Sequence, residues 1–365
     1  MAIVNTIFAS VVEKWFNPIV AKVNEKINDK NEEPNLLFKQ ALVEELSTDM
    51  RWDSTDFNQS IYLADVVSLD SSLPLRKRDS VQRATGLIPK VGHKAFLSEK
   101  VLSDLFVLQA KGVKEEEIVK KVLNDVPRLV KGIEYLNELT FEQALSTGVC
   151  IYPSLEGAST GIRLNFGYKD DNFLKVANKW STAQATPLSD IERLITKAKN
   201  NGDSIGVIWL SKTAFNRIRT SEEGKILAAN YAGQIFTNSA KLLTPPQSRM
   251  INALRDEYGV EFIIVDSTFR RQSLSGGYNT ATGWEEEAVV GTATNKVGRL
   301  VYSATVEEQR KVESVTYSKA GSYILVSKWS DNDPIKEWTG AQALVCPVID
   351  QAESIYVLKS ETLSE

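Results

Sequence analysis

The sequence predicts an α+β protein that carries an inserted α/β domain. Three observations lead to this fold class. Apolar residues recur at three- and four-residue spacing near the N-terminus, which is typical of amphipathic helices. Residues 186–270 alternate between helical and strand-like segments, as α/β domains do. From residue 288 onwards, short apolar segments that are typical of strands dominate the chain.

Residues 1–50 are predicted to be helical. One apolar stripe runs along them, and the polar run 28–35 interrupts it. Two interpretations of this helix remain open, because its apolar face could pack on the core of its own chain or on another subunit.

Residues 60–98 differ from the helical start and predict a long extended hairpin with a basic tip. The stretch contains β-forming residues, prolines, glycines and a strong excess of cations. Such a long connection without helical period is usually functional or disordered, and a solvated surface is the alternative to a functional role. The cations considered are Arg76, Lys77, Arg78, Arg83, Lys90 and Lys94.

Three helices are predicted between residues 98 and 148. The second carries Glu115–Glu117 in its first turn, where the helix dipole favours negative charge. The third and longest spans residues 125–147, because Pro127 is tolerated in a first turn and Gly148 can end the helix.

The remaining elements define the inserted domain and its surroundings. Residues 149–180 predict a β-hairpin that leads to a third strand. The alternation in 186–270 implies that some strands are parallel neighbours. Residues 271–283 are predicted to be a loop, since Ser, Gly and Asn dominate them.

Composition excludes several classes of function. The chain has 365 residues, 43 Lys+Arg and 47 Asp+Glu, so its net charge of −4 does not favour a general nucleic-acid binder. The single histidine, His93, rules out His-rich zinc centres and two-His metal motifs. Cys150 and Cys346 lie in apolar runs and are expected to be buried and reduced. No apolar stretch is long enough to predict a membrane span.

No motif predicts a catalytic, cofactor-binding or metal-binding residue. Phosphate-loop, dinucleotide-binding and serine-nucleophile motifs are all missing from the sequence. The acidic clusters 115–117 and 285–287 do not place two carboxylates opposite each other, and we interpret them as solvated charge. The seven tryptophans suggest no stacking array.

The order of the elements, together with several segments, resembles a known family. The segments are LADVVSLDSSLPLRKR, ATGLIPKVGHKAFLSEKVL, IEYLNELTFEQALSTGVC, KWSTAQATPLSDIERL, GVIWLSKTAFNRI, GRLVYSATVEEQ, DNDPIKEW and ALVCPVIDQAESIYVLK. They resemble the major capsid proteins of tailed phages, in particular the lambda-type family called major capsid protein E. The resemblance runs from about residue 60 to the end of the chain.

This resemblance implies a Hong Kong 97-type phage capsid fold. The fold is expected to comprise an N-terminal arm (1–58), an E-loop hairpin (59–98), a peripheral domain (99–185) with a spine helix (125–147), an axial domain (186–283) and a return segment (284–365). The resemblance implies a structural virion protein and no enzyme, assembled in the host cytoplasm as pentamers and hexamers into an icosahedral shell around double-stranded DNA. A separate scaffolding protein and a portal are expected partners, a decoration protein could bind as well, and no cofactor is expected.

The expected contacts between subunits join the basic hairpin to acids of a neighbour. The candidate acids are Glu115, Glu116, Glu117, Glu134 and Glu138. Two alternatives remain open. One is an encapsulin-like shell that encloses a cargo enzyme. The other is a small-molecule α/β enzyme that uses residues 186–270, with a pocket near Asp190, Asp203 or Asp266.

Overall fold

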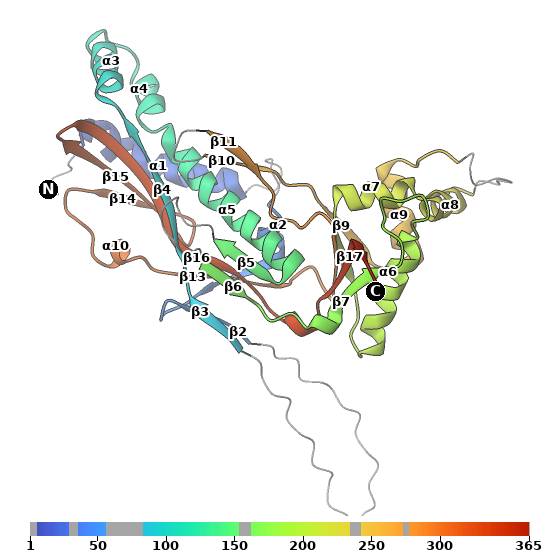
Figure 1. Ribbon diagram of the computed structural model, residues 1–365. Coiled ribbons are helices and arrows are strands. Elements are labelled where there is room, and N and C mark those ends of the chain that lie inside the picture. The colour runs from blue at the N-terminus through green and yellow to red at the C-terminus, as the bar shows by residue number, and fades with distance from the viewer. Residues whose placement is uncertain are drawn as a thin grey trace, which may run out of the picture. The chain divides into compact units, whose positions relative to one another are not determined.

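The computed structural model describes residues 6–28, 36–55, 83–152, 162–233, 242–272 and 277–364 (Figure 1). These residues fall into two compact units. The first unit comprises the described residues within Met1–Trp52, Gly86–Phe141 and Arg299–Pro347; the second comprises those within Asp53–Thr85, Glu142–Gly298 and Val348–Glu365. Of the helices that the structure describes, none has the length and hydropathy to cross a bilayer.

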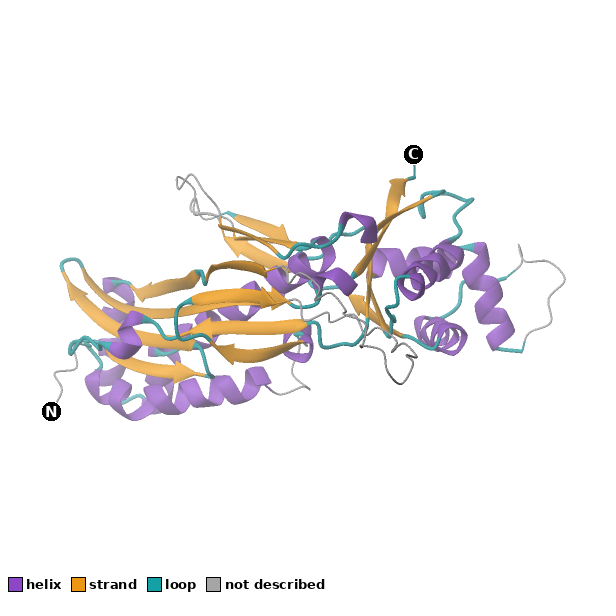
Figure 2. Ribbon diagram, turned by 90° about the horizontal axis from the view of Figure 1, so that it is seen from below, coloured by secondary structure: helices purple, strands orange, loops and turns teal. Residues whose placement is uncertain are grey.

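A six-stranded sheet organises the first unit. Its strands run in the order β1 (Leu42–Leu46), β13 (Gly298–Ser303), β16 (Ile335–Ile349), β15 (Ile324–Asn332) and β14 (Thr316–Ala320), and β4 (Lys90–Leu97) also pairs with β16. The helices of this unit are α1 (Ala9–Asn28), α2 (Leu37–Ala41), α3 (Glu99–Ala110), α4 (Glu115–Val122), α10 (Val306–Gln309) and α5 (Asp125–Thr147) as far as Phe141. Helices lie along one side of the sheet in Figure 2.

The covered face of this sheet contains a buried ion pair. Lys328 of β15 and Glu337 of β16 are fully buried, and Lys328 Nζ lies 3.5 Å from Glu337 Oε1. Lys328 also donates to the Val122 carbonyl at the end of α4. Glu337 accepts hydrogen bonds from the Thr6 hydroxyl and from the Ile7 amide, which lie just before α1 in the chain. The pair therefore joins the sheet to two separate helical segments.

Helix α1 packs on the core of its own chain. Phe16 and Val20 on its apolar stripe are fully buried, and Asn24 lies close to the turn at Gly321, next to β14. The structure thus decides between the two interpretations that the sequence left open for this helix.

Two local expectations were wrong. Residues 42–46 form strand β1 in the sheet and not part of a helix, because tertiary pairing overrides a weak local preference. Residues 271–283 are not simply a loop, since β10 (Phe269–Gln272) and β11 (Tyr278–Ala281) form an antiparallel hairpin.

The second unit combines helices with a sheet that has parallel and antiparallel strand pairs. Its sheet has the order β7 (Phe173–Val176), β17 (Tyr356–Leu363), β12 (Ala288–Thr292), β8 (Val207–Ser211) and β9 (Glu261–Val265). The β8–β9 and β17–β7 pairs are parallel. Its helices are α6 (Pro187–Asn200), α7 (Lys212–Thr220), α8 (Glu222–Tyr231) and α9 (Gln247–Tyr258), and β5 (Val149–Tyr152) and β6 (Ile162–Asn165) form the predicted hairpin.

We expect Lys328→Met to lower the free energy of unfolding by about 3–5 kcal/mol, because it leaves the Glu337 carboxylate buried without its counter-charge. Denaturant titration of unassembled protein measures this change. Adding Glu337→Gln to Lys328→Met removes the isolated charge and should recover most of the loss.

Lys14→Met is the matched control, because Lys14 pairs with Glu115 on the surface. Its expected cost is below about 1 kcal/mol. Equal losses for Lys328→Met and Lys14→Met would contradict a structural role for the buried pair.

Candidate assembly surfaces

The outer face of the first unit's sheet carries a row of aromatic rings and lysines, which we call the aromatic–lysine ladder. The row consists of Phe96 and Lys94 on β4, Lys336 and Trp338 on β16, and Trp329 on β15. Cross-strand register brings the rings together, because Trp338 is paired with Phe96 on one side and with Trp329 on the other. Side chains alternate between faces along a strand, so the ladder lies opposite the buried Lys328–Glu337 pair.

The rings of the ladder are in direct contact, and ammonium groups lie over them. Trp329 and Trp338 stack with centroids 6.1 Å apart and an interplanar angle of 12°, and Phe96 lies 5.0 Å from Trp338. Lys94 Nζ is 4.3 Å from the Trp338 centroid. Lys336 Nζ is 4.7 Å from the Phe96 centroid. Such cation–π contacts are worth about 0.5–1 kcal/mol each at exposed positions.

The ladder retains positive charge that the described residues do not neutralise. Neither Lys94 nor Lys336 forms an ion pair with a carboxylate in the described part of the chain. Asp331, which is paired with Lys336 across the two strands, instead accepts a hydrogen bond from Trp338 Nε1 at 2.7 Å. Phe96 remains 48% exposed. An exposed aromatic surface of this kind, with free cations, is typical of an interaction site.

A shallow hollow of about 340 Å³ adjoins the ladder. Gly92 and Gly340 help to line it, and both lack room for a side chain. A Cβ on Gly92 would lie 2.7 Å from the Ala341 carbonyl oxygen, and one on Gly340 would lie 3.0 Å from Ser327 Oγ. A side chain at either position would therefore collide with these neighbouring atoms.

The structure accounts for only some of the predicted basic residues. Arg76, Lys77 and Arg78 lie outside the described residues, and of Arg83 only the backbone, in β3 (Arg83–Leu87), is described. Lys90 forms an ion pair with Glu307 at 2.9 Å, and Lys94 belongs to the ladder.

The predicted acids Glu115, Glu116 and Glu117 lie in the exposed first turn of α4. Glu115 accepts hydrogen bonds from Lys14 and from Trp15 Nε1, and these contacts lower the pKa of its carboxyl. The side chains of Glu116 and Glu117 form no hydrogen bond or ion pair within the described residues. These two carboxylates are available to a partner.

Glu134 and Glu138 were expected to pair with the basic hairpin of a neighbouring subunit, but the structure buries both of them. Glu138 on α5 accepts hydrogen bonds from the Leu37 and Phe38 amides at 2.9 and 2.8 Å, so it caps the first turn of α2. Glu134 accepts from the Tyr323 hydroxyl and lies 3.5 Å from Lys39. Both carboxylates hold the chain's own segments on α5, and a neighbouring hairpin cannot reach them.

Burial shifts the titration of both carboxyls. Removal from water raises the pKa of Glu138 to about 7, although the two amide donors act in the opposite direction. Burial likewise raises the pKa of Glu134, while Lys39 and the Tyr323 hydroxyl counteract it. Protons therefore bind the folded protein more tightly than the unfolded chain at these positions.

We expect the free energy of unfolding of the wild type to fall, relative to that of the Glu138→Gln variant, as the pH rises. A raised pKa contributes stability that is complete below the ordinary carboxyl value of 4.5 and is lost as the pH passes about 7. The difference between the two proteins should change by about 3 kcal/mol between pH 4.5 and 8.

Denaturant titrations of unassembled protein across this pH range measure the change. Glu116→Gln, on the surface of α4, is the control for the removal of a carboxylate. A difference between wild type and Glu138→Gln that stays constant with pH would show that the Glu138 carboxyl does not titrate near neutrality.

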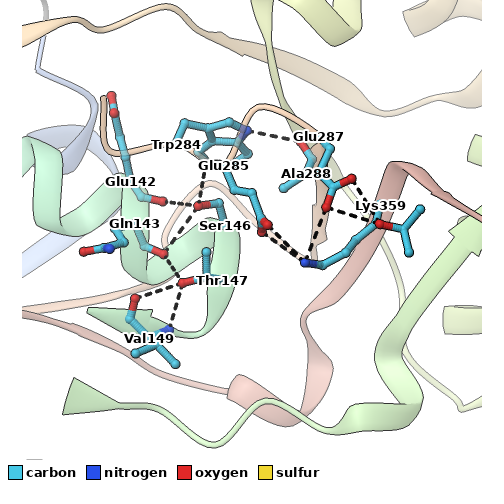
Figure 3. A network of polar contacts seen from close by, with 11 residues as sticks. Glu142, Gln143, Ser146, Thr147, Val149, Trp284, Glu285, Glu287, Ala288 and Lys359 are labelled. Atoms are coloured by element: carbon cyan, nitrogen blue, oxygen red, sulfur yellow. Dashed lines mark hydrogen bonds and ion pairs between the residues drawn. The ribbon is translucent and has the colours of Figure 1, made fainter. Parts of the chain in front are cut away.

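The second acidic cluster belongs to a polar network in the second unit (Figure 3). Lys359 Nζ lies 3.1 Å from Glu285 Oε1 and 3.7 Å from Glu287 Oε1. The Glu285 amide donates to Ser146 Oγ near the end of α5, at 3.1 Å. These glutamates are thus paired and not simply solvated, and they link three segments of this unit that are distant in sequence.

The aspartates that the enzyme alternative would need all have local structural partners. Asp190 accepts a hydrogen bond from Trp180 Nε1 at 2.9 Å, Asp203 accepts from the Tyr356 hydroxyl at 2.6 Å, and Asp266 pairs with Lys212. Burial raises the pKa of Asp190. A hollow of about 600 Å³ in this unit is lined by other residues: Trp180, Ser181, Thr182, Ala183, Ala185, Arg217, Thr220, Ser221, Glu222 and Lys225.

The cysteines behave as the sequence predicted. Cys150 and Cys346 are buried and no disulfide joins them, and burial raises the pKa of the Cys150 thiol to about 12. A thiol held in this protonated state is a poor nucleophile.

The ladder is the feature that sequence reasoning missed. A signal for it was present in the hairpin turn at Asp333–Pro334. Trp329 lies four residues before Asp333 and Trp338 four residues after Pro334, so a tight turn between two strands pairs them directly.

Comparison of this chain with known proteins identifies its fold. No family model matches the chain, and no curated protein does. A solved structure assigned as the capsid protein of an Escherichia coli CFT073 prophage aligns with a TM-score of 0.57 and 14% identity, over 94% of this chain and 98% of that chain. A phage-related protein from Bordetella bronchiseptica RB50 aligns with a TM-score of 0.50 and 12% identity, over 95% and 97%.

These alignments extend over almost the whole of both chains, so they concern the complete order of elements and not one common domain. The chain therefore has the α+β fold of phage capsid proteins, as the resemblance implied.

Proposed function

We propose that the chain is the major subunit of a tailed-phage capsid. It assembles as pentamers and hexamers into an icosahedral shell that encloses packaged double-stranded DNA. The observation that carries this proposal is the end-to-end agreement of the fold with the prophage capsid protein, which covers 94% of this chain and 98% of that chain. The partners are other copies of this chain, a separate scaffolding protein and a portal.

The charge and the surfaces of the chain support a shell. A net charge of −4 keeps attraction to a polyanionic cargo weak. The ladder on the outer face of the sheet and the free carboxylates on α4 suit contacts between proteins. The aspartates of the second unit, by contrast, are engaged in local structural contacts. A structural role therefore fits these groups better than catalysis does.

Electron microscopy of the purified protein tests this function. The expected result is closed shells, or rings of five and six subunits, at raised protein concentration or after co-expression with neighbouring genes. Protein that stays monomeric under both conditions would overturn the proposal. Because a fold alone does not determine what a shell encloses, the contents of purified particles decide between a phage capsid, which holds DNA, and an encapsulin-like shell, which holds a protein.

We expect reversal of charge at Arg76, Lys77 and Arg78 to prevent particle formation while the isolated subunit still folds. The proposed reason is that this basic segment meets acids of a neighbouring subunit, where exposed pairs fix register and steer association. Particle yield by sedimentation and folding by circular dichroism measure the two effects. Normal shells from the reversed variant would show that these three cations are dispensable.

A further inference from the structure

Two surfaces of the first unit are complementary in charge and are both unpaired in the isolated chain. One is the aromatic–lysine ladder on the outer face of the sheet. The other is the hairpin formed by α3 and α4, which projects from the end of β4 (Figure 1).

The α3–α4 hairpin leaves apolar side chains partly exposed, and Phe106 is among them even though its ring stacks on Phe8 with centroids 5.2 Å apart. Leu102 and Leu105 are the buried residues of α3. Phe106 and Val107 are 46% and 49% exposed. On the following helix, Glu116 and Glu117 are exposed and form no hydrogen bond or ion pair in the described part of the chain. The hairpin thus presents apolar side chains together with two free carboxylates.

The ladder presents the opposite arrangement. Its rings offer apolar surface, and Lys94 and Lys336 are held within 5.5 Å of the Trp338 centroid without a carboxylate partner among the described residues. A carboxylate placed between these ammonium groups would neutralise both, and apolar side chains beside it would cover the exposed edge of Phe96. Desolvated charge-assisted hydrogen bonds of this kind are stronger than neutral ones.

We propose that the α3–α4 hairpin of one copy docks on the aromatic–lysine ladder of a second copy, with Glu116 and Glu117 facing Lys94 and Lys336. This inference rests on the proposed shell function and specifies one of its contacts. Because the two surfaces differ, each copy uses its α3–α4 hairpin to contact one neighbour and its aromatic–lysine ladder to contact another. Such a heterologous contact forms a ring when its rotation closes.

Charge exchange between the two surfaces tests this contact. Lys94→Glu with Lys336→Glu, and separately Glu116→Lys with Glu117→Lys, should each lower the yield of shells or rings at least about tenfold, because like charges then face each other. The chain that carries all four substitutions should recover to within about threefold of the wild type. Lys179→Glu with Lys199→Glu, on exposed lysines of the second unit, controls for the change in net charge and should assemble normally.

The outcomes separate this contact from the shell function. Wild-type protein that forms no shells would contradict the proposed function itself. If the wild type forms shells, two results would overturn the contact alone. One is normal assembly of either double variant, and the other is a fourfold variant that does not recover assembly. If reversal disturbs folding, as circular dichroism would show, Lys94→Cys with Glu116→Cys provides the second test. Oxidation of assembled particles should then link subunits through disulfides in denaturing gels, and unlinked subunits would also overturn the contact.

Discussion

The buried pair of Lys328 and Glu337 is the constraint on which the first unit depends. Two opposite charges at full burial are stable only with close partners, and here the partners come from the start of α1 and the end of α4. The pair therefore fixes which face of the sheet the helices cover. Because side chains alternate along a strand, the same register directs Trp329 and Trp338 to the opposite face. A shift of one residue would bury the indoles and expose the charges.

Carboxylates on α5 meet a similar constraint in a different way. Segment 36–46 is short, and the helix within it, α2, has five residues and no side chain of its own that caps it. Glu138 supplies the cap from α5. A long helix that turns acids inward would be unstable alone, but here the acids hold a neighbouring segment whose amides need acceptors. Glu134 and Glu138 on α5 thus hold segment 36–46 in place.

Much of the fold could be predicted because local signals coincide with tertiary structure. The helix at 125–147 and the buried strand at 207–211 have strong period or strong apolar character, together with clear ends such as Gly148. Strands β1 and β10 lack such signals, and their conformation depends on partners distant in sequence or across a turn. Local sequence patterns therefore predict the elements with strong intrinsic preferences. They do not predict strands such as β1, whose conformation depends on tertiary pairing.

The candidate surfaces were harder to predict for the same reason. The sequence shows that both Glu115–Glu117 and Glu134–Glu138 are acidic. Only Glu134 and Glu138 are buried, because their partners in α2 and at Tyr323 are remote along the chain. The ladder depends on register across three strands. Sequence composition can thus identify charged residues, whereas only the packed sheet decides which of them remain free for a partner.

A sheet that is covered on one face leaves a choice for the other face. A monomer usually fills that face with small polar side chains, since exposed aromatic patches favour association. In this chain the outer face instead has two indoles and a phenyl ring beside two ammonium groups, and α3 exposes Phe106. The exposed parts of these rings contact water in an isolated subunit, and a second surface that covered them would remove this apolar area from water. The register that stabilises the interior of the first unit therefore also determines where a second protein surface can bind.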